Sequence, residues 1–433
     1  DPFVASENAG FTVFGLNSAD FSNLPARIDG FTIGGSIAGG GVQVYQYAHN
    51  LRISNNRIEG NQGTYCGGIS VGLLDNADAV YENYNVTIQG NQILKNGGVK
   101  GAGGVAIFAG ANGYRILDNL IIGNFCRNNG GGIGHQGVSD GGMIARNTIL
   151  NNEVFYGIAV GGDGGGIYIG GANAVAGLSD GAGSVSIDAN LIQGNLAGSG
   201  NGGGIALNGV NGADVAASSN PNDWYTINIF NNIIVNNVAG YAGGGMALSD
   251  AARVRIIHNT VAHNDSTATS KSAFPPGATN SAPQGAGIVA FAHRAPLAEE
   301  SGQTFSNPTL YDSILWRNRS FYYNSGMQDV APNPSQPYHD LAVFGAAGQM
   351  DPRACVLTSV SGYHSSNIAD DPRLSDAYTN ELMAAAVIDE AGNNIAVRFP
   401  ETGLYPPNGA TLRGDYHLIG TGAAATSPVN NGG

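Results

Sequence analysis

The sequence predicts an all-β fold, a single solenoid that winds as a parallel β-helix of about 8 to 10 coils, with loop insertions and a C-terminal cap. Three observations predict it. The pattern I-x-x-N-x-I-x-x-N recurs seven times with fixed spacing, Val261 replacing the second Ile in the last copy. A Gly-apolar step, such as Gly132-Ile133, follows every copy. No window carries a sustained helical period, and β-branched residues in short runs indicate strands.

The first asparagine of each copy marks one coil. Successive ones lie 35, 28, 28, 43, 42 and 27 residues apart, and they are Asn56, Asn91, Asn119, Asn147, Asn190, Asn232 and Asn259. The shortest spacings suit a coil of three short strands with their turns, and the longer ones suit the same coil with inserted loops. Because strands of neighbouring coils pair in a sheet, we expect the coils to lie about 4.8 Å apart.

The repeated positions predict stacked columns. Each isoleucine of the pattern should point inward and pack on its counterpart in the next coil. Each asparagine should lie at a turn and hydrogen-bond the amides above and below it, which makes a structural ladder that satisfies buried polar groups. Ligand binding is the alternative use of these asparagines. The glycine before the apolar strand should supply a tight turn or a positive φ.

Several motifs carry a family resemblance. The N-x-I-x-x-N copies, the Gly-Gly-Gly-Ile steps and the opening run Arg27–Gly35 resemble right-handed parallel β-helix proteins of the pectin-lyase-like superfamily. Asp371-Pro372 and Asp415–Leu418 resemble the closing segments of such proteins. The resemblance covers residues 27 to 320 well and the tail loosely. It implies a right-handed winding, and functions that range from polysaccharide lyases, hydrolases and epimerases to adhesins, so fold does not fix function.

The amino-acid composition limits which classes of binding partner the protein is expected to have. Charged residues make up 12% of the chain, glycine occurs 68 times, and the formal net charge is −14. This acidic, lysine-poor balance argues against a nucleic-acid partner, because no basic patch is evident in the sequence. It is typical of a secreted or cell-surface protein. No stretch has the length of a membrane-spanning helix.

The cysteines predict free thiols. Cys66 and Cys126 belong to coils two apart, a separation of about 10 Å that is too long for a disulfide bond. With Cys355 they make an odd count. We expect all three to be buried and reduced.

The domain boundaries follow the repeat. Residues 1–26 are predicted to form an N-terminal cap or the remnant of an upstream coil, and residues 27–320 the β-helix. Residues 321–433, where the repeat fades, should form a C-terminal cap that folds back on the helix. A short helix is predicted at residues 380–388.

Charged residues that could perform catalysis are sparse. The outward positions after the Gly-apolar step are small and nearly chargeless, which does not suit a groove for an anionic polymer. Asp118 and Arg146 occupy the same position in successive coils, so they should form a surface ion pair; a catalytic pair is the alternative. We assign no catalytic residue and no metal ligand.

Inserted loops provide the candidate binding residues. Asp223, Trp224 and Tyr225 share one such loop, where exposed rings could stack on a sugar; the alternative is that the rings hold the loop in place. Asp75, Asp78 and Glu82 share another, where Ca²⁺ is an open alternative to no cofactor, although no regular calcium-loop spacing is present. An apolar stripe should be covered by the tail or should form an interaction surface; it comprises Leu120, Ile122, Leu150, Leu191, Ile233 and Val235.

These observations favour a secreted or cell-surface structural or adhesive protein. It would contact a partner, such as a polysaccharide, or its own copies through the inserted loops or the apolar face. The alternative is a polysaccharide-active enzyme, a lyase or a hydrolase, which the resemblance implies. A hydrolase would need two carboxylates held a few ångströms apart, which the sequence alone cannot place.

Overall fold

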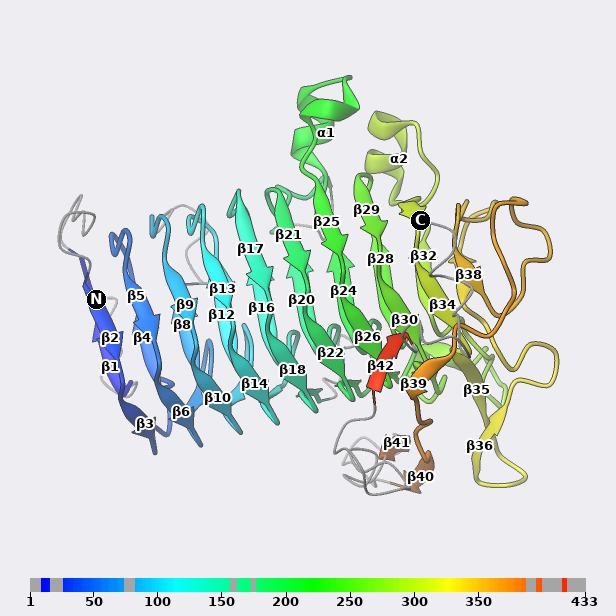
Figure 1. The fold of residues 1–433 in the computed structure, drawn as a ribbon, viewed down its shortest axis with the longest axis horizontal. Coiled ribbons are helices and arrows are strands. Elements are labelled where there is room, and N and C mark those ends of the chain that lie inside the picture. The colour runs from blue at the N-terminus through cyan, green and yellow to red at the C-terminus, as the bar shows by residue number, and fades with distance from the viewer. Residues whose placement is uncertain are drawn as a thin grey trace, which may run out of the picture.

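The predicted all-β parallel solenoid is confirmed. The computed structural model describes residues 9–15, 26–73, 82–155, 162–172, 177–386, 395–398 and 415–418. Short parallel strands stack in register along one axis (Figure 1). Each regular coil contributes four strands, one more than expected, because a two-residue strand follows the second asparagine of each copy. The four resulting sheets are numbered 1 to 4 in the order in which each regular coil visits them, starting from the first isoleucine of the repeat.

Sheet 1 carries the first isoleucine of each copy, and sheet 2 carries the second. The strands of sheet 1 are β2 (Arg27–Asp29), β5 (Arg52–Ser54), β9 (Thr87–Gln89), β13 (Arg115–Leu117), β17 (Gly142–Ala145), β21 (Val185–Asp188), β25 (Ile227–Phe230), β29 (Val254–Ile257) and β33 (Thr309–Tyr311). The strands of sheet 2 are β3 (Thr32–Gly34), β6 (Arg57–Glu59), β10 (Gln92–Leu94), β14 (Leu120–Ile122), β18 (Thr148–Leu150), β22 (Leu191–Gln193), β26 (Ile233–Val235), β30 (Thr260–Ala262), β34 (Ile314–Trp316) and β38 (Val356–Leu357).

Sheet 3 follows the second asparagine, and sheet 4 follows the Gly-apolar step. The strands of sheet 3 are β7 (Gln62–Gly63), β11 (Gly97–Gly98), β15 (Phe125–Cys126), β19 (Glu153–Val154), β23 (Leu196–Ala197), β27 (Val238–Ala239), β31 (Asp265–Ser266), β35 (Arg319–Asn324) and the antiparallel β36 (Asp329–Pro332). The strands of sheet 4 are β1 (Phe11–Val13), β4 (Val42–Val44), β8 (Ile69–Val71), β12 (Val105–Phe108), β16 (Ile133–Gln136), β20 (Ile167–Gly170), β24 (Ile205–Asn208), β28 (Met246–Ser249), β32 (Ile288–Phe291) and β37 (Leu341–Phe344).

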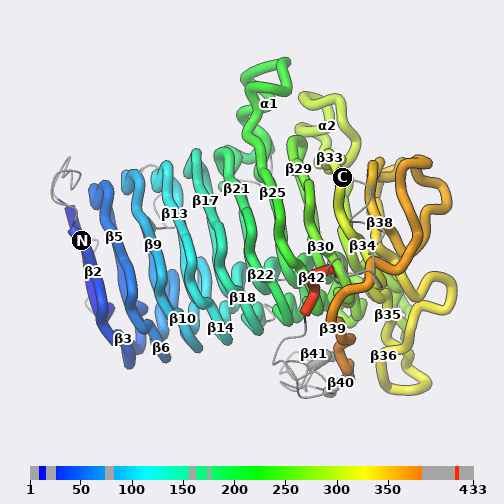
Figure 2. Tube along the Cα trace, viewed as in Figure 1, coloured from blue at the N-terminus to red at the C-terminus, as the bar shows by residue number. Residues whose placement is uncertain are grey.

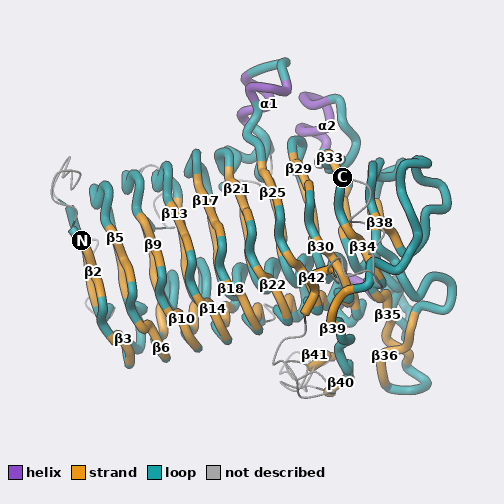
Figure 3. Tube along the Cα trace, in the orientation of Figure 1, coloured by secondary structure: helices purple, strands orange, loops and turns teal. Residues whose placement is uncertain are grey.

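The remaining elements lie in loops and in the tail. Helices α1 (Ala213–Ala217) and α2 (Ala295–Ser301) interrupt loops that lead from sheet 4 to sheet 1, and they project from one edge of the solenoid (Figure 3). Two 3-10 turns occur at Pro221–Asp223 and Lys271–Ala273. In the tail, β39 (Leu374–Asp376) pairs with β42 (Asp415–Leu418), and β40 (Met383–Ala386) pairs with β41 (Ile395–Arg398). The helix predicted at 380–388 is therefore wrong where β40 lies.

The sheets continue outside residues 27–320. Strand β1 adds to sheet 4 before that range, and β37 and β38 add to sheets 4 and 2 after it. Most of the predicted N-terminal cap, residues 1–8 and 16–25, lies outside the described residues.

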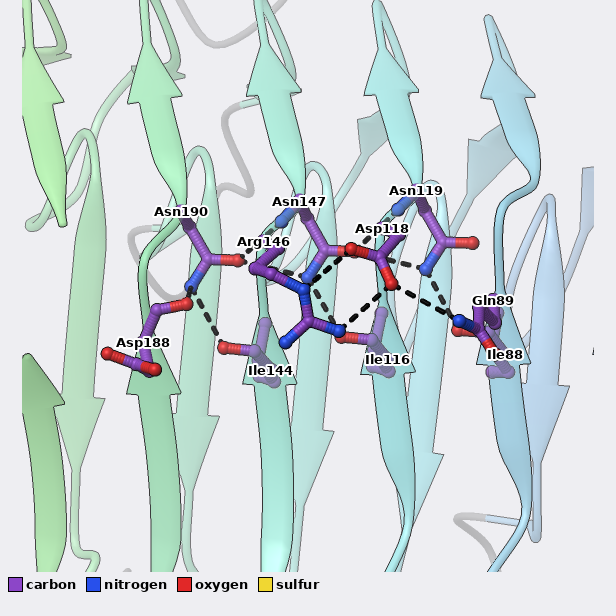
Figure 4. A network of polar contacts seen from close by, with 10 residues as sticks. All are labelled: Ile88, Gln89, Ile116, Asp118, Asn119, Ile144, Arg146, Asn147, Asp188 and Asn190. Carbon is purple, nitrogen blue, oxygen red and sulfur yellow. Dashed lines mark hydrogen bonds and ion pairs between the residues drawn. The ribbon is translucent and has the colours of Figure 1, made fainter. Parts of the chain in front are cut away.

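Two asparagine ladders run along the solenoid, at the turns on either side of sheet 2. Asn147 is typical of the first. Its Nδ2 donates to Oδ1 of Asn190 at 3.0 Å and to the carbonyl of Ile116 at 2.9 Å (Figure 4). Its Oδ1 accepts from the backbone N and from Nδ2 of Asn119, both at 3.0 Å. The second ladder consists of Asn61, Asn96, Asn124, Asn152, Asn195, Asn237, Asn264 and Asn318.

Side chains of other types end the ladders. In the first, the Oγ of Ser313 accepts from the backbone N of Asn259 at 3.2 Å. In the second, Oδ1 of Asp340 accepts from Nδ2 of Asn318 at 2.8 Å, and Oδ2 accepts from the backbone N of Thr358 at 3.0 Å. Burial raises the pKa of Asp340. A carboxylate can only accept, which suits a position where no further amide follows.

Two glycines of the Gly-Gly-Gly-Ile step are needed for different structural reasons. Gly130 has a φ of 71°, as the turn requires. At Gly132, for which a tight turn or a positive φ was predicted, φ is not positive. There a Cβ atom would lie 2.7 Å from the carbonyl oxygen of Gly166 in the next coil. This glycine is needed because neighbouring backbones approach closely, not because of its dihedral angles.

Isoleucines and other aliphatic side chains fill most of the core, and His135 is a buried polar residue among them. All three cysteines are free and buried, as predicted. His135 points inward from β16 and is 0% exposed. Its Nε2 lies 2.7 Å from the carbonyl of Gly137 and 3.0 Å from that of Ala182, so Nε2 carries the proton. Its Nδ1 then accepts from the hydroxyl of Tyr114 at 2.9 Å.

This histidine should make stability depend on pH. Burial lowers the pKa of His135 to about 4, whereas an unfolded histidine titrates near 6.5. Stability is therefore lost as pH falls from about 6.5 toward 4, by about 2 to 3 kcal/mol at pH 4.5. We expect His135→Gln, which keeps hydrogen-bonding groups but does not titrate, to lose correspondingly less stability than the wild type. Urea unfolding of both proteins at pH 7 and pH 4.5 measures this difference. Equal losses would show that His135 is not its source.

The C-terminal tail covers part of the apolar stripe on the outer face of sheet 2 (Figure 2). Tyr378 and Tyr416 pack with Val235, Ala262 and Trp316, which are at most 7% exposed. Leu150 is also buried, whereas Leu120, Ile122, Leu191 and Ile233 are partly exposed. Among the six stripe residues, only Ile233 and Val235 pack with the described part of the tail, so the prediction that the tail covers the stripe is confirmed at these two positions.

Candidate functional site

An arginine column runs along the outer face of sheet 1. The residue before the first isoleucine of each copy points outward, because side chains alternate along a strand. Arg27 pairs in register with Arg52, Arg52 with Thr87, and Thr87 with Arg115. The three arginines are exposed, and Thr87 is half-buried. The fold thus places three guanidinium groups in line within four adjacent coils.

A hollow of about 530 Å³ lies over this column. Its lining residues are Asn50, Arg52, Asn85, Thr87, Gln89, Arg115 and Leu117. Among the described residues, the guanidinium group of Arg52 makes one hydrogen bond, a long one to Gln89 at 3.4 Å. The guanidinium group of Arg115 has no hydrogen-bond partner within the part of the chain that the structure describes. The hollow therefore offers two guanidinium groups, three amides and a hydroxyl, and no carboxylate among its lining residues.

Asp118, a carboxylate that Gln89 of the lining contacts, is already paired with an arginine. Arg146 donates to both oxygens of Asp118, at 2.7 and 2.9 Å, and Gln89 donates to Oδ2 at 3.2 Å (Figure 4). These hydrogen bonds, that of Arg146 first, lower the pKa of Asp118. The predicted surface ion pair is confirmed, with side chains 53% and 38% exposed. Both oxygens of Asp118 are occupied, so this residue neither accepts a proton readily nor competes for Arg52 and Arg115.

The loop with the predicted binding residues lies elsewhere, at the edge between sheets 4 and 1. The ring of Trp224 is 5% exposed and packs with Val215, Ala252 and Leu297. Its Nε1 donates to the carbonyl of Ser218 at 2.7 Å. This packing matches the alternative in which the ring holds the loop in place.

The two neighbours of Trp224 also have partners within the loop. Asp223 accepts from the hydroxyl of Ser218 at 2.7 Å. The backbone N of Tyr225 donates to Asp214 at 2.8 Å, and burial raises the pKa of the Tyr225 hydroxyl. None of the three residues lines the sheet 1 hollow.

No metal site emerges from the described residues. Among them, no three His, Cys, Asp or Glu side chains gather as metal ligands would. Asp75 and Asp78 of the calcium alternative lie outside the described residues. Glu82 is half-buried.

Sequence reasoning missed the arginine column, although its signal is present. The position before the first isoleucine is Arg in four coils, at Arg27, Arg52, Arg115 and Arg255. The net charge of −14 obscures it, because a total charge says nothing about how charges are distributed over a surface. The expectation of no basic patch is therefore wrong for this face.

No protein-family model, no curated protein and no solved structure matches this chain. In the described part of the chain, no helix combines the length and the apolar character needed to cross a membrane.

Proposed function

We propose that this chain is a non-catalytic, adhesive β-helix of a secreted or cell-surface protein, and that it binds an acidic polysaccharide along sheet 1. The observation that carries the proposal is the sheet 1 hollow, in which Arg52 and Arg115 flank amide and hydroxyl groups. Arginine suits carboxylate and sulfate groups, because its planar fork donates two parallel hydrogen bonds.

The arginine column runs along the solenoid axis, which favours an extended polymer as the ligand over a small ion. Each coil advances about 4.8 Å, so the line from Arg27 to Arg115 spans roughly 14 Å along the axis. An extended polymer with repeated anionic groups could contact each arginine in turn. The acidic remainder of the surface would repel the same polymer, which would confine binding to this face.

A binding role suits the hollow better than an enzymatic one. A hydrolase needs two carboxylates, and a lyase needs a base beside carboxylates or calcium that neutralise the sugar acid. The lining residues supply neither arrangement. We also propose that the chain belongs to the pectin-lyase-like superfamily and winds in the right-handed sense. The alternative function is that of a polysaccharide lyase or hydrolase.

Charge-removing variants test the proposal. We expect wild-type protein to bind a polyuronate and not a neutral glucan in affinity electrophoresis and calorimetry. Each arginine exchanged for glutamine should weaken binding by about 1 kcal/mol, or about fivefold, since the contacts are solvent-exposed. Arg52→Gln with Arg115→Gln should weaken it roughly 30-fold.

Arg127→Gln is the matched control, because Arg127 is also exposed but follows β15 in sheet 3. Unchanged polyuronate binding by the double variant would sink the proposal. Release of unsaturated or reducing ends from the polymer would favour the enzymatic alternative.

A further inference from the structure

A second hollow, of about 90 Å³, lies on the outer face of sheet 4. Strands β24, β28 and β32 contribute its floor, and two residues of the preceding turns form one side. The lining residues are Asp163, Asn201, Ala206, Leu207, Asn208, Ala247, Ser249 and Phe291. The space admits one functional group of a ligand and not a whole sugar ring, since pockets for complete small molecules start near 300 Å³.

The polar groups of this hollow have unused hydrogen-bonding capacity. Oδ1 of Asp163 accepts from the backbone N and Nδ2 of Asn201, at 2.7 and 3.3 Å. Within the described residues, Oδ2 of Asp163 has no partner, and the buried Oδ1 of Asn201 has none either. The side chains of Asn208 and Ser249 form no hydrogen bond to other described residues. The lining of the hollow therefore holds two acceptor atoms without a described donor, and a ligand that donates hydrogen bonds would suit them.

The carboxyl group of Asp163 and the aromatic rings beside it indicate what kind of donor group the ligand carries. Burial raises the pKa of Asp163 to about 6, although the hydrogen bonds from Asn201 act in the opposite direction. No described cation forms an ion pair with this carboxyl group. A bound cation would offset the cost of the buried carboxylate. Phe291 lines the hollow and stacks edge-on with Phe344, 5.5 Å between ring centroids, and Phe344 contacts Tyr241 at 5.9 Å. Aromatic faces attract ammonium groups and pack on sugar rings.

We infer that this hollow binds the ammonium group of an amino sugar, with Asp163 and Asn201 as acceptors and Phe291 beside the ring. The ammonium group supplies three donors and one positive charge, which match the two free acceptors and the carboxylate. Asn208 and Ser249 remain to bond the sugar hydroxyls, which a lysine side chain lacks. The site is separate from the sheet 1 hollow and binds a ligand of opposite charge.

Titration calorimetry with a glucosamine tetramer and its fully N-acetylated form tests this inference. The two share ring and hydroxyls and differ in charge. At pH 7 we expect the charged tetramer to bind at least tenfold more tightly. Asp163→Asn should abolish that preference, while its remaining oxygen can still accept from the backbone of Asn201. Phe291→Ala should weaken binding of both tetramers.

Two controls separate this site from unspecific charge attraction. Asp351→Asn removes an exposed carboxylate and should leave the preference intact. Arg52→Gln should leave it intact as well, so failure of the acidic-polysaccharide proposal and failure of this one are distinguishable. Equal binding of both tetramers by wild type would overturn the inference. Binding of a lysine-rich peptide as tightly as the amino sugar, lost in Asp163→Asn, would overturn the assignment to a sugar.

Discussion

Asn147→Ala is expected to destabilise the protein by about 4 kcal/mol or more. The substitution removes four hydrogen bonds of the first ladder, those to Ile116, to Asn190 and two to Asn119. A hydrogen bond contributes about 1 kcal/mol net, and a buried group left without a partner costs more. Asn147 is 1% exposed, so water cannot readily replace the lost amide.

Urea unfolding and amide hydrogen exchange measure this effect together. A solenoid need not unfold in one step, so exchange in the adjacent coils shows whether the loss is local. Asn307→Ala is the control, because Asn307 is exposed and its side chain has no described partner. That change should stay within about 0.5 kcal/mol. Similar losses in the two variants would contradict the role of the ladder.

Arg319→Ala is expected to cost about 3 to 5 kcal/mol at pH 7, because it leaves a buried carboxylate unpaired. Arg319 donates to both oxygens of Asp265, at 2.7 and 2.8 Å, and to the carbonyl of Asn380 in the tail at 2.8 Å. Asp265 is 0% exposed. Asn380 also donates to Asp265 at 3.0 Å and to the carbonyl of Asn236 at 2.9 Å. The substitution should therefore also loosen the tail.

The pH dependence of the variant has a defined sign. Burial raises the pKa of Asp265 even with the arginine present, and loss of the arginine should raise it further. A carboxyl group whose folded pKa exceeds the unfolded value, about 3.9, is least unfavourable when protonated. The penalty should thus be largest near pH 7 and shrink as pH falls toward 4.

A second substitution tests the cause. Asp265→Asn in the Arg319→Ala background removes the unpaired charge, so it should recover much of the lost stability. Arg353→Ala breaks an exposed ion pair with Asp351 and should cost less than about 1 kcal/mol. The denaturant midpoints of the wild type, of Arg319→Ala, of the double variant and of Arg353→Ala measure these differences in stability. Failure of the second substitution to recover stability would show that the buried charge is not responsible.

The sequence predicted the structural features that recur from coil to coil. Each coil places its isoleucine and asparagine directly on those of the next, so inward packing, the ladder and the Asp118–Arg146 pair follow from spacing alone. The same reasoning could have found the arginine column, since Arg27, Arg52 and Arg115 occupy one repeated position. It could not give the fourth strand, because a two-residue pairing leaves almost no pattern.

Only the tertiary structure decided the contacts that do not repeat. Nε2 of Gln193 donates to the hydroxyl of Tyr378 across 185 residues, and Asn236 donates to the carbonyl of Tyr378 across 142. No periodicity connects such positions, so no spacing predicts them. The burial of Trp224 and the convergence of Asp163 with Phe291 have the same origin, since inserted loops and turns bring them together. The sequence by itself determined the stacked coils because each coil pairs with the next through one repeated register. The tail and the candidate sites depended on packing between unrelated segments, which exists only once the chain has folded.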